Sequence, residues 1–79
     1  MSERITITDV RERAINLNRR IVSTGRHVQA QQRNGYVALD EYQGAACIRT
    51  ITVGTKREVA DFLYAMMVGI DLSRSNPIT

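Results

Sequence analysis

The sequence predicts an α+β fold in the order helix, strand, strand, strand, helix, with both helices on one face of a three-stranded antiparallel sheet. Two terminal segments have the apolar spacing of helices, a regular alternation surrounds an Asn-Gly pair, and a run rich in branched residues follows it. With 79 residues, the chain has room for one core. We expect a single domain over residues 1–72 and a disordered tail over residues 73–79.

The first helix is predicted from about residue 7 to about residue 23. Thr6 and Asp9 have the spacing of a capping box, in which each side chain bonds the backbone N–H of the other residue. Apolar residues on one helix face follow: Val10, Ala14, Leu17 and Ile21. Gly25 can then adopt the left-handed conformation that ends a helix.

Asn34-Gly35 predicts a tight hairpin with a type I′ turn between the first two strands. Folding about this pair sets Arg33 opposite Tyr36. The residues directed to the core are then Val28, Ala30, Val37 and Leu39. The other face is expected to be open and polar, and its residues are Gln29, Gln31, Arg33, Tyr36, Ala38 and Asp40.

A turn over residues 43–45 leads to a third strand over residues 47–53, whose register is open. In one register the core-facing residues are Cys47, Ile51 and Val53. Arg49 then faces the core as well and needs a partner. In the other register the core-facing residues are Ile48, Thr50 and Thr52. Arg49 then lies on the open face, and we favour this register near Arg49, with a bulge.

The second helix begins after Thr55, which has capping-box spacing with Glu58. Lys56 and Arg57 occupy its first turn, at the positive end of the helix dipole, where cations cost about 0.3–1 kcal/mol. Free N–H groups, the dipole and two cations together favour a bound anion. The alternative is a solvated first turn, in which the two cations pair with Glu58 or Asp61.

These features predict a site for a phosphorylated ligand, with the phosphate on the helix start and a tyrosine stacking on a base. The residues predicted to form it are Thr55, Lys56, Arg57, Arg49, Tyr36 and Tyr42. For the tyrosines, packing on the sheet is the alternative role.

The second helix is apolar almost all round, which exceeds what one face of a three-stranded sheet can cover. Its main stripe consists of Val59, Phe62, Leu63, Met66 and Ile70. We attribute the excess to a second protein surface and predict a homo-oligomer with Tyr64, Met67 and Val68 at the contact.

An enzyme is not expected. Asp40 and Glu41 are adjacent in a strand, so they point to opposite faces and cannot act as a carboxylate pair. The single histidine, His27, is interpreted as a solvated or capping residue, and Cys47 as a small buried hydrophobe. No pattern of metal ligands or phosphate-cradling glycines occurs, so we expect no metal and no cofactor. No run of about 18 apolar residues occurs, so we expect no membrane partner.

The net charge is +3, and ten of the eleven basic residues are arginine. This skew favours planar, bidentate contacts with phosphate or carboxylate. A GC-rich coding genome explains the skew equally well.

The chain resembles a family of small uncharacterised proteins from phages and prophages over residues 6–72. The resemblance rests on a leading helix over 9–18 that carries Leu17-Asn18, a strand over 36–42, the Gly44 turn, the Gly-Thr-Lys-Arg-Glu segment over 54–58, and Gly69-Ile70. It implies this fold and a viral origin, and therefore the cytoplasm of an infected bacterial host cell. It implies no particular activity.

The element order also looks like the double-stranded-RNA-binding domain, which has basic residues at the start of its second helix. Lys56 and Arg57 match this feature, whereas Glu58 occupies the third basic position. Phe62 and Tyr64 stand where that domain has small residues.

These observations predict a non-enzymatic phage protein that sequesters a phosphorylated nucleotide signal of host immunity, by analogy to other viral sponges. Two alternatives stay open. One is an inhibitor that binds a host protein complex through the open sheet face or an edge strand. The other is a nucleic-acid-binding module, which would show steep salt dependence.

Overall fold

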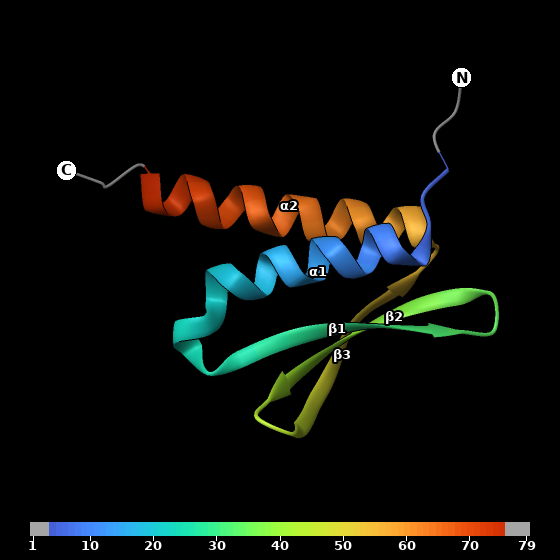
Figure 1. The fold of residues 1–79 in the computed structure, drawn as a ribbon, viewed down its shortest axis with the longest axis horizontal. Coiled ribbons are helices and arrows are strands. Elements are labelled where there is room, and N and C mark those ends of the chain that lie inside the picture. Colours follow the sequence, from blue (N-terminus) through green and yellow to red (C-terminus); the bar gives the residue numbers. More distant parts are fainter. Residues whose placement is uncertain (1–3, 76–79) are drawn as a thin grey trace.

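The computed structural model describes residues 4–75 and confirms the predicted order of helix, three strands and helix. Its elements are α1 (Ile7–Ile21), a 3₁₀ turn (Val22–Thr24), β1 (Arg26–Arg33), β2 (Tyr36–Gln43), β3 (Ala46–Gly54) and α2 (Lys56–Ser75). The strands form one antiparallel sheet in the order β1-β2-β3. The two helices lie side by side against the sheet, and both begin at the same end of the molecule (Figure 1).

The start of α1 is the predicted capping box. The Thr6 N–H donates to Asp9 Oδ2 at 2.9 Å, and the Asp9 N–H donates to Thr6 Oγ1 at 3.2 Å. The bonds from Thr6 hold the pKa of the Asp9 carboxyl below its usual value. The helix ends at Ile21, slightly earlier than predicted, and the 3₁₀ turn leads to Gly25 with φ +77°.

The β1–β2 hairpin has the predicted register, with Arg33 opposite Tyr36 and Ala30 opposite Leu39. The predicted type I′ turn is wrong, because that type needs positive φ at both central residues. Gly35 has φ +75°, whereas no residue other than glycine within 4–75 has a positive φ, Asn34 included. A negative φ followed by a positive one is the pattern of a type II turn.

The helix-facing side of the hairpin is buried as predicted, but the opposite face is less open than expected. Ala38 and Asp40 lie on that face and are nevertheless buried. Both belong to β2, the central strand, which has a neighbouring strand on each side. The Asp40 carboxylate accepts from Arg33 Nη2 at 3.3 Å and from Thr50 Oγ1 at 2.7 Å.

β3 contains two irregularities, which agrees with the expected bulge and extends it. Leu39 pairs with Thr52 while Asp40 pairs with Thr50, so Ile51 has no opposite partner. A second shift lies between Glu41 and Tyr42, at Ile48 of β3. Each bulge interrupts the alternation of faces along the strand. The face of each β3 residue therefore cannot be obtained by simple counting.

The core lies between the helices and one face of the sheet. Its buried members are Val10, Ala14, Leu17, Val28, Ala30, Val37, Leu39, Val59, Ala60 and Leu63. Arginines on the flank of α1 join the two helices. Arg13 Nη1 donates to the Ala60 carbonyl at 3.1 Å, and Arg20 makes a two-point contact with Asp71 at 2.9 and 3.2 Å. The later residue of α1 contacts the later residue of α2, so the two helices run in the same direction.

The C-terminal end of α2 extends beyond the predicted domain boundary. The helix continues through Ser75, so residues 73–75 are helical rather than part of a disordered tail. The physical stop signal in the sequence is Pro77, since the residue before a proline disfavours the helical conformation. The rest of the predicted tail, residues 76–79, lies outside the described residues.

Candidate functional site

The start of α2 has the predicted capping box. The Thr55 N–H donates to Glu58 Oε1 at 2.8 Å, and the Glu58 N–H donates to Thr55 Oγ1 at 3.1 Å. The helical ladder begins with the Val59 N–H, which donates to the Thr55 carbonyl at 3.0 Å. A helix leaves its first four N–H groups without helical partners, and the box serves only part of that set.

A pocket of about 350 Å³ lies against this helix start. Its lining consists of Ile5, Gln32, Gly35, Tyr36, Val37, Thr55, Lys56 and Arg57. The lining therefore comes from the segment before α1, from the β1–β2 hairpin and from the first turn of α2. Figure 1 shows these three segments at the same end of the molecule.

Four of the six predicted ligand residues meet at this pocket: Thr55, Lys56, Arg57 and Tyr36. Tyr36 is 40% exposed as a residue, so a planar group can reach it and stack on its ring. None of the ion pairs within residues 4–75 involves Lys56. The pocket thus combines positive charge, helix N–H groups and an aromatic ring, which is the chemistry needed to hold a phosphate attached to a base.

The other two predicted residues, Tyr42 and Arg49, lie elsewhere. Tyr42 stands six residues beyond Tyr36 on β2, which corresponds to about 20 Å along an extended strand. Its ring stacks on His27, with ring centroids 5.2 Å apart and an interplanar angle of 11°. This stacking fits the alternative interpretation, in which Tyr42 packs on the sheet.

Arg49 lies on the helix-facing side of the sheet, so the favoured register is wrong at this position. Arg49 is paired in register with Glu41, and its Nε donates to Glu41 Oε1 at 2.8 Å. The two bulges flank this pair, which explains why the strand alternation misplaced it. In the less favoured register Arg49 faces the core and needs a partner, and Glu41 is that partner.

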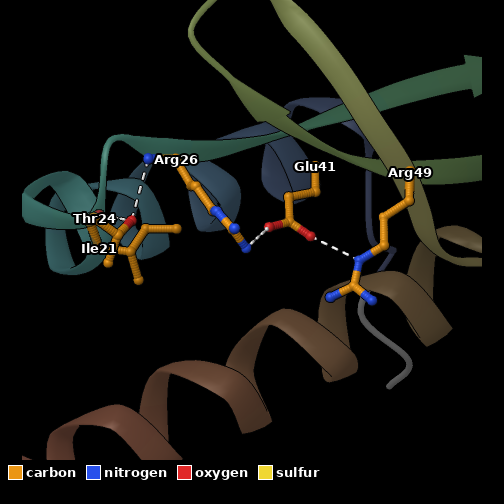
Figure 2. A network of polar contacts seen from close by, with 5 residues as sticks. All are labelled: Ile21, Thr24, Arg26, Glu41 and Arg49. Carbon is orange, nitrogen blue, oxygen red and sulfur yellow. Dashed lines mark hydrogen bonds and ion pairs between the residues drawn. The ribbon is translucent and has the colours of Figure 1, made fainter.

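Glu41 was considered from the sequence only as half of a carboxylate pair with Asp40, and its burial between two arginines was not predicted. It is buried on the helix-facing side and also accepts from Arg26 Nη1 at 3.0 Å (Figure 2). The hydrogen bond from Arg49, followed by that from Arg26, holds the pKa of the Glu41 carboxyl below its usual value. The signal was present, because Glu41 continues the alternation of Val37 and Leu39 on the core face.

Asp40 and Glu41 point to opposite faces of the sheet, as predicted. The arginine partner of Asp40 lies on one side of the sheet, and the two arginine partners of Glu41 lie on the other. Cys47 was misjudged, since it is exposed rather than buried. It lies near the β2–β3 turn, where the helices do not cover the sheet.

Among residues 4–75, no group of three or more histidine, cysteine or acidic side chains could hold a metal ion.

No protein-family model matches the chain. Neither a curated protein nor a solved structure shows significant similarity to it. The resemblances to the phage family and to the double-stranded-RNA-binding domain therefore stay predictions.

The residues predicted for an oligomer contact differ in exposure. Tyr64 is 58% exposed and Val68 36%, whereas Met67 packs partly against the core. Leu72 is 61% exposed and follows Val68 by one helical turn, so the outer stripe consists of Tyr64, Val68 and Leu72. No helix within residues 4–75 is long and apolar enough to cross a bilayer.

Proposed function

We propose that this protein binds a phosphorylated small ligand, of the nucleotide class, in the pocket between the β1–β2 hairpin and the start of α2. One observation carries the proposal: two elements far apart in sequence place Tyr36, Lys56 and Arg57 in the lining of one pocket. The phosphate lies on the first turn of α2, and a base stacks on the Tyr36 ring.

The electrostatics of the first turn support an anion. Lys56 and Arg57 occupy the first turn of a 20-residue helix, at the positive end of its dipole, where a nearby anion is stabilised. A phosphate there gains charge-assisted hydrogen bonds from both side chains and from first-turn N–H groups. The Glu58 carboxylate is engaged by the Thr55 N–H, which keeps that oxygen in the capping box.

In this proposal the protein is encoded by a phage and sequesters a nucleotide signal of host immunity. It binds the ligand without changing it chemically. Binding should therefore be stoichiometric, and the bound nucleotide should be recovered intact by chromatography after denaturation. A recovered nucleotide that has been cleaved or has lost phosphate would contradict sequestration and indicate an enzyme.

Self-association through the outer face of α2 is part of this proposal. Tyr64, Val68 and Leu72 form an exposed apolar stripe on a helix whose opposite face already covers the core. Burial of such a stripe against a second copy removes apolar surface from water.

Nucleic acid is the second candidate, favoured by one observation. The helices run in parallel against an antiparallel sheet, and the β1–β2 hairpin and the start of α2 lie at one end (Figure 1). In the double-stranded-RNA-binding domain, which this element order resembles, basic residues at the start of the second helix lie against phosphates. A protein host target is not favoured by any particular contact.

A thermal-shift screen tests the two candidates together, with cyclic dinucleotides, ADP-ribose derivatives and short RNA and DNA duplexes as probes. A nucleotide ligand should raise the melting temperature as its concentration exceeds Kd, with weak salt dependence. A duplex should bind with an affinity that falls steeply as salt increases. If no probe shifts the melting temperature, both candidates are rejected.

A further inference from the structure

A second groove, separate from the α2 start, lies between the sheet and the middle of α2. Its volume is about 500 Å³. The apolar part of its lining consists of Ile21, Val28, Ile51 and Met66. The polar part consists of Thr24, Arg26, Glu41 and Arg49. Figure 2 shows Arg26, Glu41 and Arg49 together on the side of the sheet that faces α2.

The guanidinium groups of Arg26 and Arg49 each use only part of their N–H donors to bond Glu41. Arg49 bonds Glu41 through Nε, and Arg26 bonds it through Nη1. Figure 2 shows both Nη atoms of Arg49 turned away from Glu41 and toward α2. The terminal edge of this guanidinium, which carries two parallel N–H donors, matches the two oxygens of a carboxylate.

The loop before β1 fixes the position of Arg26. Thr24 Oγ1 donates to the Ile21 carbonyl and accepts from the Arg26 N–H at 3.1 Å, as Figure 2 shows. These bonds hold Arg26 at the first position of β1, opposite Gln43. One guanidinium therefore stands on each side of Glu41 before any ligand arrives.

The charges of this cluster match a monoanion. Two guanidinium cations and one carboxylate leave a net charge of one positive unit. The Arg26 and Arg49 side chains are 50% and 67% exposed, whereas that of Glu41 is only 10% exposed. An incoming anion therefore meets the cations first, and a single negative charge neutralises the net charge of the cluster.

We propose that this groove binds a small amphiphilic monocarboxylate, with its carboxylate on the free edge of Arg49 and its apolar body against Ile51 and Met66. Ligand sites commonly combine an apolar lining with a few convergent polar groups in this way. The site is independent of the pocket at the α2 start, since the two linings share no residue.

Octanoate is the test probe, with 1-octanol and octyl phosphate as comparison ligands. The measurement is NMR titration of the full chain, in which the Met66 methyl group and the Arg49 Nε–H report on the groove. Octanoate should shift both signals and saturate. Octanol should bind about tenfold more weakly, because it lacks the charge-assisted hydrogen bonds.

Arg49→Gln should weaken octanoate binding by about tenfold, for the same reason. Arg33→Gln is the matched control, because Arg33 also pairs with a buried carboxylate but on the opposite face of the sheet. Its octanoate affinity should stay within about twofold. If Arg49→Gln fails to fold, the three ligands on the unmodified chain decide the question alone.

Four results would overturn the proposal. They are the absence of a saturable shift with octanoate, equal binding of octanol, tighter binding of octyl phosphate, and an equal loss of affinity in Arg33→Gln.

Discussion

The side chain of Asn18 on α1 holds both backbone groups of Val28 on β1. Its Nδ2 donates to the Val28 carbonyl at 2.9 Å, and its Oδ1 accepts from the Val28 N–H at 2.7 Å. β1 is an edge strand, so these groups would otherwise face outward without a strand partner. One amide thus fixes α1 against the sheet and occupies part of the β1 edge.

Asn18→Ala is expected to lower the free energy of unfolding by about 1–3 kcal/mol, because it leaves two partly buried backbone groups without these bonds. Urea denaturation followed by circular dichroism measures the change. Asn16→Ala on the same helix is the control, and it should change stability by less than about 0.5 kcal/mol. Equal effects of the two substitutions would refute this role for Asn18.

Gly54→Ala is expected to disrupt the capping box of α2. A Cβ at this position would lie 2.7 Å from Glu58 Oε1 and 3.1 Å from Glu58 Cβ. The Glu58 carboxylate must then leave the Thr55 N–H, which should cost about 0.5–2 kcal/mol, as loss of a cap does. Chemical denaturation measures this cost.

A double-mutant comparison isolates the cause. In a Glu58→Ala background, Gly54→Ala should cost less, since the 2.7 Å contact is gone. A cost that is the same in both backgrounds would assign the effect to the glycine backbone instead.

The stability of the fold should decrease in acid, partly through Glu41. Its arginine partners lower its pKa in the folded protein, so its contribution is complete above the ordinary glutamate value of about 4.5 and is lost as pH falls through the folded-state value. Denaturation midpoints measured between neutral pH and acid should show this loss.

Glu41→Gln should make stability less dependent on pH in that acid range. Some dependence should remain, because Asp9 and Asp71 also have lowered pKa values, through their bonds with Thr6 and Arg20. An unchanged pH dependence in Glu41→Gln would show that its arginine contacts do not persist in solution.

Sedimentation velocity tests self-association through the outer stripe of α2. The unmodified chain should sediment as a dimer or larger species at micromolar concentration. Tyr64→Glu should shift it to the monomer, because it places a charge in the apolar contact. Ile15→Glu is the control, since Ile15 is similarly exposed on α1, outside the stripe. A monomeric unmodified chain would remove this part of the proposal.

Local signals predicted most of the fold. Both capping boxes and the Asn34-Gly35 hairpin involve residues within a few positions of one another, so spacing alone identifies them. The turn type was predicted wrongly although the register was right, because this register is compatible with either sign of φ at Asn34. One bulge in β3 was expected, but neither the positions of the bulges nor their number could be read from the sequence, and the face of Arg49 was misjudged for that reason.

The candidate site was predictable only in part. Lys56 and Arg57 could be placed on a helix start from the sequence, but their proximity to Tyr36 depends on which end of the sheet each connection occupies. Tyr36 and Tyr42 look equivalent in the sequence, and only their positions at opposite ends of β2 distinguish them. The Asn18 contact with Val28 depends on how the 3₁₀ turn reverses the chain and lays β1 against α1.

The central claim is that Lys56 and Arg57 bind a phosphorylated ligand, and one comparison of variants tests it most directly. Thermal shifts with the cyclic dinucleotide and ADP-ribose probes are measured for the unmodified chain, for Lys56→Ala/Arg57→Ala and for Arg11→Ala/Arg19→Ala. The second variant removes the same charge from exposed positions of α1, away from the pocket.

We predict a ligand-dependent rise in melting temperature for the unmodified chain, retention of that rise in Arg11→Ala/Arg19→Ala, and its loss in Lys56→Ala/Arg57→Ala. An equal loss in both variants would show that overall positive charge, and not the start of α2, attracts the ligand. An undiminished rise in Lys56→Ala/Arg57→Ala would contradict the central claim outright.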